Sequence, residues 1–257
     1  KAMLAIGASL QRLPTMEAPG TTDVIQVIGI TGTIGAGKGT AVEQLMQPPH
    51  NFVHYSARTL LNEMVAEQGL PPGRDSLREV ANAMRLKHGP AAVIEALFAK
   101  ARAVGKDAII ESVRTEGEVL ALRESGFPFT LLAVDADQRL RYDRVTTRGS
   151  STDSVSFEKF RAQEATEMAS AQAHEQNLAR CMALADATLL NNGTQTEFRA
   201  CVNDFALRLR GGGGGRRGGR SQLLAVVIVS GVLTIAGAVW YQSRRSRASS
   251  RAKKSST

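Results

Sequence analysis

A glycine-rich loop that carries one lysine is the stretch of this chain best suited to chemistry. Glycines let backbone N–H groups turn inward around a polyphosphate, because they have no Cβ atom to clash. Residues 24–30 before the loop are rich in β-branched side chains and predict a buried strand, and residues 41–46 after it predict a helix. Strand, loop, lysine and helix in this order predict a P-loop that binds a nucleoside triphosphate. Its expected phosphate-binding residues are Gly32, Thr33, Ile34, Gly35, Ala36, Gly37, Lys38, Gly39 and Thr40.

Lys38 is expected to reach the β- and γ-phosphates, and Mg²⁺ is expected beside it. The general motif places Ser or Thr directly after the lysine, but here Gly39 stands there and Thr40 follows. Either Thr40 or a water held by the backbone therefore meets the metal. Glu111 ends the apolar run 107–111, which predicts a strand. A carboxylate at a strand end beside the P-loop suits Mg²⁺, so Thr40 and Glu111 are the predicted metal ligands.

Arg114 comes three residues after Glu111, at the edge of the sheet where ligands bind in such folds. The planar guanidinium fork suits a phosphate, which makes Arg114 a candidate both for catalysis and for substrate binding. An ion pair between Glu111 and Arg114 on a loop is the alternative interpretation.

A later predicted helix, residues 138–148, carries several arginines. Arg144 and Arg148 are four residues apart and share one helix face. We expect them to join Lys38 in stabilising the charge of a transferring phosphoryl group. Arg139 and Arg141 on the same helix are interpreted as a solvated basic face.

The acceptor of such a phosphoryl group is expected on residues between the second and third predicted strands. Ser56 and Arg58 begin a predicted helix, where an anion can rest on the N-terminal backbone. Asn82 and Arg85 share a face of another helix and suit an acceptor's base or phosphate. Asn192, after the last predicted strand, is expected to lie against adenine, and a plain Asn-Gly turn explains it equally well.

The net charge of +8 belongs to the C-terminal part of the chain. From Arg208 onward there are eleven Lys and Arg residues and no Asp or Glu, so residues 1–207 carry 21 basic and 24 acidic side chains. A mildly acidic body without interleaved aromatic residues argues against nucleic-acid binding. We therefore expect no nucleic-acid partner.

Strands alternating with helices predict an α/β fold, a three-layer α/β/α sandwich with a parallel, doubly wound sheet. The predicted kinase-type domain covers residues 21–210, with an acceptor-binding helical insert at about 56–104 and a short lid at about 144–160. Residues 1–20 are expected to be a disordered segment or the remnant of a targeting peptide. Residues 211–221 read as a Gly/Arg linker and residues 243–257 as a basic disordered tail.

The range 223–241 holds nineteen uncharged residues, about the length that spans a bilayer as a helix. Trp240 and Tyr241 suit an interfacial belt, and arginines flank both ends. We expect a single-pass transmembrane helix at 222–242 that acts as a C-terminal tail anchor, with the main domain in the cytosol. Basic flanks on a short, moderately apolar span resemble tail anchors of mitochondrial or plastid outer membranes.

Taken together, these motifs resemble those of the P-loop small-molecule kinases, which include adenylate kinase, other nucleoside monophosphate kinases and dephospho-CoA kinase. An adenylate-kinase-like group, often labelled dephospho-CoA-kinase-like, shows three matching segments. They are Gly-x-x-Gly-x-Gly-Lys-Gly, Val-Ala-Asn-x-x-Arg and Ile-Glu-Ser-x-Arg, found here at residues 32–39, 80–85 and 110–114. The resemblance implies an ATP- and Mg²⁺-dependent transferase, with Arg144 and Arg148 as lid-side arginines that hold ATP phosphates.

Two departures from these kinases leave the acceptor open. Adenylate kinases place Gly-Asp and then Arg after the second strand, but this chain has Ser56-Ala57-Arg58-Thr59. Dephospho-CoA kinases place a catalytic Asp near the same point, and residues 51–74 contain none. The expected function is transfer of the γ-phosphate of ATP to a small nucleotide-type acceptor at a membrane. The alternative is a slow or non-catalytic ATP-binding switch or scaffold module at a membrane.

Overall fold

The computed structural model describes residues 24–149, 156–170, 172–211, 227–229 and 232–233. At its centre lies a sheet with the strand order β2-β3-β1-β4-β5-β6-β7, in which every neighbouring pair is parallel except β6 and β7. The strands are β1 (Val27–Gly32), β2 (Val53–Ser56), β3 (Ala108–Glu111), β4 (Phe129–Asp135), β5 (Ala187–Leu190), β6 (Val227–Val229) and β7 (Val232–Leu233).

Helices connect the parallel strands from β1 to β5, as parallel pairing requires. Together with the helix after β5 they are α1 (Lys38–Met46), α2 (Ala57–Glu67), α3 (Arg74–His88), α4 (Ala92–Val104), α5 (Glu116–Glu124), α6 (Gln138–Arg148), α7 (Phe157–Met168), α8 (Leu178–Ala183) and α9 (Gln195–Gly211). The predicted α/β fold with a parallel sheet is confirmed, and the strands predicted at 24–30 and 107–111 and the helices predicted at 41–46 and 138–148 correspond to β1, β3, α1 and α6.

Alternating strand residues build two cores, one on each face of the sheet. Val27 packs with residues of α4 and α5, whereas the next residue, Ile28, packs with residues of α1 and α9. The same alternation holds in β3 and β4, where Ile110 and Leu131 join the first core and Ile109 and Leu132 the second. Burial on both faces explains why these strands are continuous apolar runs.

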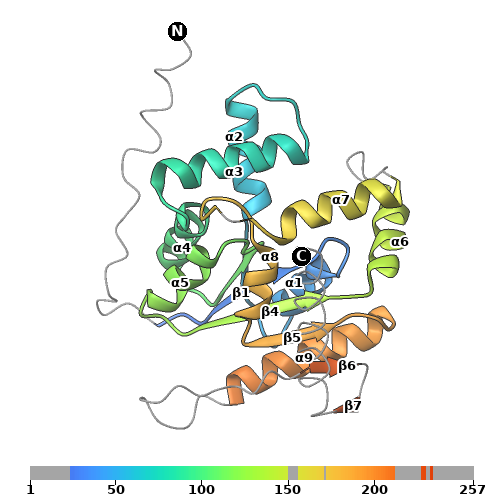
Figure 1. The fold of residues 1–257 in the computed structure, drawn as a ribbon. Coiled ribbons are helices and arrows are strands. Elements are labelled where there is room, and N and C mark those ends of the chain that lie inside the picture. The colour runs from blue at the N-terminus through green and yellow to red at the C-terminus, as the bar shows by residue number, and fades with distance from the viewer. Residues whose placement is uncertain (1–23, 150–155, 171, 212–226, 230–231, 234–257) are drawn as a thin grey trace, which may run out of the picture.

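Two helical segments stand above the P-loop end of the sheet (Figure 1). In that view α2 and α3, which belong to the expected insert, form the top of the molecule, and α7 runs toward them from the side of α6. Residues 150–155 of the expected lid lie outside the described residues.

The expected transmembrane helix at 222–242 is not seen at the five residues of that range that the structure describes. They form β6, which pairs with β5, and β7. The run Val226-Val-Ile-Val229 is β-branched, which favours a strand over a helix. Among the described parts of the chain, no helix has the length and apolar character needed to cross a membrane. Segments 1–20, 212–221 and 243–257 lie outside the described residues.

Candidate functional site

The P-loop connects the end of β1 to the start of α1. Lys38 is the first residue of α1, and its Nζ donates hydrogen bonds to the carbonyl oxygens of Gly32 and Thr33 at 2.9 and 2.8 Å. Burial, with the nearby charge of Arg114 as the next cause, lowers the pKa of Lys38 from 10.5 to about 7. The ammonium group is thus held in place and poorly solvated, and the nearby charges of Glu111 and Glu167 offset this burial only in part.

Close packing under the loop explains why Gly37 must be glycine. Its φ is 105°, and a Cβ atom there would lie 2.3 Å from Nδ2 of Asn191. That amide group in turn donates a hydrogen bond of 2.8 Å to the carbonyl oxygen of Ala36. Gly39 differs, because a Cβ atom there would meet nothing within 4 Å. Asn191 therefore packs against the loop backbone at Gly37, whereas the space next to Gly39 is open.

A cavity of about 570 Å³ lies over the loop, between the P-loop, α2, α3, α6 and α7. It brings together most of the residues predicted for the site. Those that line it are Ile34, Gly35, Gly37, Lys38, Gly39, Thr40, Arg58, Arg85, Glu111, Arg114, Arg144 and Arg148. Among the residues that the structure describes, eight cationic and four acidic side chains line this cavity, so it suits an anionic ligand.

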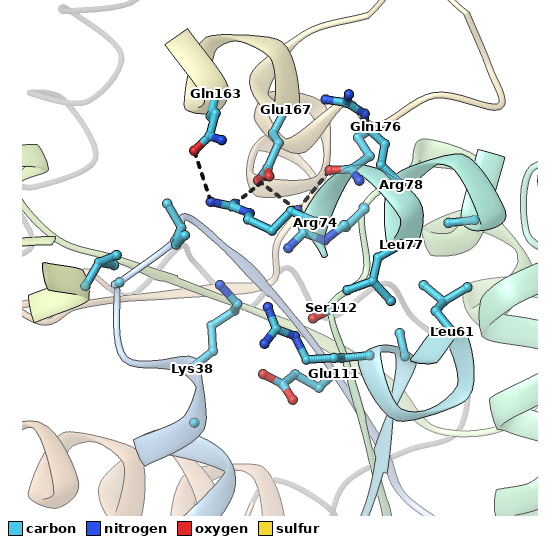
Figure 2. Close-up of a pocket in the computed structure, with 18 of the residues that line it drawn as sticks. Lys38, Leu61, Arg74, Leu77, Arg78, Glu111, Ser112, Gln163, Glu167 and Gln176 are labelled. Atoms are coloured by element: carbon cyan, nitrogen blue, oxygen red, sulfur yellow. Dashed lines mark hydrogen bonds and ion pairs between the residues drawn. The ribbon is translucent and has the colours of Figure 1, made fainter. Parts of the chain in front are cut away.

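Glu111 stands at the end of β3 and faces Lys38 on the P-loop side of the cavity (Figure 2). Its Oε2 lies 3.1 Å from Nε2 of His54, a partner on β2 that we did not predict. Burial acts to raise the pKa of Glu111, but the His54 hydrogen bond and the charges of His54, Lys38 and Arg114 outweigh it, so the pKa is lowered. Glu111 is therefore a carboxylate at neutral pH, as a Mg²⁺ ligand must be.

Ser112 follows Glu111 with a φ of 73°, which is rare for a residue with a side chain. Its backbone N–H donates to the carbonyl oxygen of Ile30, and so does that of Val113. These bonds hold the turn that directs Arg114 toward the cavity. The sequence gives no local signal for this turn, because serine has no special preference for it.

A buried ion pair supports the segment that carries Arg114. Arg85 donates two hydrogen bonds to one oxygen of Glu118, and both side chains are almost fully buried. The other Glu118 oxygen accepts from the backbone N–H of Arg114 at 2.6 Å and of Thr115 at 3.1 Å. Arg85, predicted to bind substrate, thus lines the cavity but has its charge paired with Glu118.

On the α7 side of the cavity, two arginines converge on one carboxylate that the sequence reasoning missed, and Figure 2 shows Arg74 at this contact. Oε1 of Glu167, on α7, accepts from Arg74 at 2.7 Å, and Oε2 accepts from Arg114 at 3.0 Å. Gln163 and Gln176 accept further bonds from the same two arginines. The sequence does place Gln163 and Glu167 four residues apart, on one face of the same helix, and this spacing could have indicated that they act at one site.

Helix α6 holds its arginines in different ways. Arg144 lines the cavity and donates to the backbone oxygen of Asn191 at 2.9 Å, and Arg148 lines it as well. The interpretation of Arg141 as a solvated residue is wrong, because it is 5% exposed. It binds the carbonyl oxygen of Ile34 and pairs with Glu164 of α7, which covers this helix. Arg139 is exposed, as expected.

The other predicted site residues do not line the cavity. Gly32 and Thr33 contribute the carbonyl oxygens that hold Lys38, and Ala36 is fully buried. The remaining three make structural hydrogen bonds, two of them within their own helix and one between segments. Ser56 caps α2 by accepting from the N–H of Thr59, Asn82 accepts a 3.5 Å bond from Arg85, and the Asn192 side chain accepts from the N–H of Asp137.

Comparisons with known proteins agree with this P-loop arrangement. A family described as "AAA domain" matches residues 28–169. The UPF0200 protein of Methanoculleus marisnigri is 30% identical over 190 residues, which cover 73% of this chain and 98% of that protein. The UPF0200 protein PAE1629 of Pyrobaculum aerophilum is 32% identical over 53% of this chain and 74% of its own length.

Two solved structures overlap more loosely with this chain. TT1252 from Thermus thermophilus has 19% identity and a TM-score of 0.47, over 73% of this chain and 99% of its own. A shikimate kinase from Bacteroides thetaiotaomicron has 12% identity and a TM-score of 0.43, over 72% and 98%. At these scores neither overlap bears on what the chain does. By the family match and the relative in Methanoculleus, the chain belongs to the AAA domain family and to the UPF0200 proteins.

Proposed function

We propose that the protein transfers the γ-phosphoryl group of ATP to a small nucleotide-type acceptor. The observation that carries this proposal is the convergence of P-loop, strand-end and helix cations on one cavity. Lys38 and Arg114 lie on the sheet side of it, Arg144 and Arg148 come from α6, and Arg58 faces it from the insert. Cations placed around a single space suit a reaction whose charge is spread over a migrating phosphoryl group.

In this proposal an acceptor oxygen attacks the γ-phosphorus while the bond to the β,γ-bridging oxygen breaks, which leaves a nucleoside diphosphate. Backbone N–H groups of the P-loop and the N-terminus of α1 hold the donor's phosphates. Lys38 leaves its carbonyl partners and binds the β- and γ-phosphates, while Arg114, Arg144 and Arg148 stabilise the migrating group. Closure of the helical insert over the cavity excludes water.

The residues present fit Mg²⁺ as well as a triphosphate. Glu111 is an ionised carboxylate, and both Glu111 and Thr40 line the cavity. One or two protein oxygens, with phosphates and waters, are the ligands that Mg²⁺ commonly takes in phosphoryl-transfer sites. When bound beside Glu111 and Thr40, Mg²⁺ would supply positive charge that offsets the charge developing on the phosphates.

The test is consumption of ATP by the purified full chain with a panel of nucleoside monophosphates and dephospho-CoA. We expect at least one acceptor to support transfer, and Lys38→Ala to abolish it. Lys100→Ala, which removes an exposed lysine of α4, is the matched control and should keep full activity. ATP binding without transfer to any acceptor would refute the enzyme and favour the nucleotide-dependent switch.

We also propose, from the sequence alone, that residues 222–242 attach this domain to a membrane, such as a mitochondrial or plastid outer membrane, in a state in which residues 227–229 and 232–233 have left the sheet. The support is the uncharged range 223–241 with its basic flanks. Alkaline extraction of membranes from cells that express the full chain tests it. Retention of the full chain in the membrane pellet, and release of a chain ended at residue 211, is the expected result. Release of both would refute the attachment.

A further inference from the structure

The contacts of Glu167 are those of an anion seated between two guanidinium groups. Arg74 begins α3 in the insert, and Arg114 follows β3 in the sheet, so the two reach the same point from separate elements. Each contributes a bond to a different oxygen of Glu167, at 2.7 and 3.0 Å. The three side chains are between 14 and 22% exposed, so this is a largely enclosed contact.

Glu167 is ionised in this position. Burial acts to raise its pKa, but Arg114, Arg74 and Lys38 outweigh burial and lower it. The Glu167 carboxylate nevertheless accepts only a few of the hydrogen bonds that the two guanidinium groups can donate. Arg114 makes both of its described side-chain bonds through Nη1, to Glu167 and Gln176, and one of the two bonds described for Arg74 is a weak 3.4 Å contact with Gln163.

A phosphate group matches this pair of forks better than a carboxylate does. It has more acceptor oxygens and a higher charge, and guanidinium forks bind it bidentately. Figure 2 shows the Arg74–Glu167 contact on the α7 side of the cavity, and Lys38, which would face the γ-phosphate of ATP. A phosphate at this point would neighbour the γ-phosphate, because Arg114 and Glu167 both act on the charge of Lys38.

We propose that Arg74 and Arg114 form a binding site for a phosphomonoester group of the acceptor, and that Glu167 occupies this site until the acceptor displaces it. That the ligand is the phosphoryl acceptor rests on the proposed function, whereas the presence of an anion site at Arg74 and Arg114 does not. Displacement need not detach α7, because Glu164, one turn earlier, pairs with Arg141 and accepts a 2.5 Å bond from Gln138. Glu167 therefore competes with the ligand while α7 stays in place on α6.

The experiment is calorimetric titration of inorganic phosphate into the full chain, with the P-loop already filled by Mg²⁺ and the β,γ-imido analogue of ATP. Glu167→Gln removes the competing charge and should bind phosphate about tenfold more tightly, which corresponds to about 1.4 kcal/mol. Arg74→Ala should bind it at least about tenfold more weakly, and Arg74→Lys should restore only part of the loss.

Matched controls come from Glu116 and Arg180, an exposed ion pair of 2.7 Å that does not line the cavity. Glu116→Gln and Arg180→Ala should leave phosphate affinity unchanged, and thermal melts show whether each variant is folded. Unchanged or weaker binding by Glu167→Gln, or no binding by any folded variant, would overturn the proposal. If the analogue does not bind, the same titrations are run in a Lys38→Ala background without it.

The two proposals fail in different ways. If the chain binds phosphate in this pattern but transfers no phosphoryl group from ATP, the anion site is supported and the kinase activity is refuted. If the chain transfers the phosphoryl group but Glu167→Gln does not raise the phosphate affinity, the kinase activity is supported. The proposal that Glu167 competes for the anion site is then refuted.

Discussion

Binding of a triphosphate should make Lys38 take up a proton, and the size of that uptake follows from the structure. Burial holds the pKa of the ligand-free lysine at about 7. Phosphate charges beside the ammonium group raise its pKa well above 8. The ligand-free lysine is then mostly charged at pH 6 and mostly neutral at pH 8, so binding takes up about 0.1 proton at pH 6 and about 0.9 at pH 8.

Calorimetry in buffers of different ionisation enthalpy measures this uptake directly. Lys38→Arg is the control, because arginine stays protonated at both pH values and its uptake reports only the nucleotide's own titration. We expect the difference between the wild type and this variant to grow from pH 6 to pH 8. Equal uptake by both proteins at pH 8 would refute the lowered pKa. Uptake that is the same at both pH values would refute it as well.

The remaining predictions concern folding and the loop. Between pH 7 and 10.5, Lys38 binds fewer protons in the folded chain than in the unfolded chain. The free energy of unfolding of the ligand-free protein should therefore rise with pH in that window, relative to that of Lys38→Met. Urea titrations at several pH values measure this difference. Gly37→Ala should abolish ATP binding, whereas Gly39→Ala, which adds a Cβ atom in open space, should leave the melting temperature within a few degrees of wild type. Arg85→Met should lower the free energy of unfolding by about 3–5 kcal/mol, because it leaves the Glu118 carboxylate buried and unpaired; a loss below about 1 kcal/mol in urea titrations would show that Glu118 finds other partners.

The fold could be predicted from the sequence because its signals are local. Apolar β-branched runs of the right length marked the strands of the parallel sheet, and the P-loop is one continuous segment. At residues 227–229 the length of an uncharged range suggested a membrane helix. The β-branched composition of the same residues favoured the strand that pairs with β5.

Much of the site depends on contacts between residues distant in the sequence, which periodicity does not report. Arg74 and Glu167 are 93 positions apart, and only the fold shows that they meet. Arg141 was interpreted as solvated, because the sequence did not show that α7 would cover its side of α6. Glu118 is different, because Thr115-x-x-Glu118 is a capping-box pattern that the sequence displays.

The contact between Gly37 and Asn191 also restricts how related sequences can vary. The amide of Asn191 fills the space where a side chain at position 37 would begin, and the same residue receives the bond from Arg144. A relative that replaces this asparagine with a smaller residue must hold the loop carbonyl of position 36 in another way, whereas the 2.9 Å bond from Arg144 goes to the backbone oxygen of position 191 and does not depend on its side chain. Positions 37 and 191 should therefore be inherited as a pair, and a relative that has changed one of them should have changed the other too.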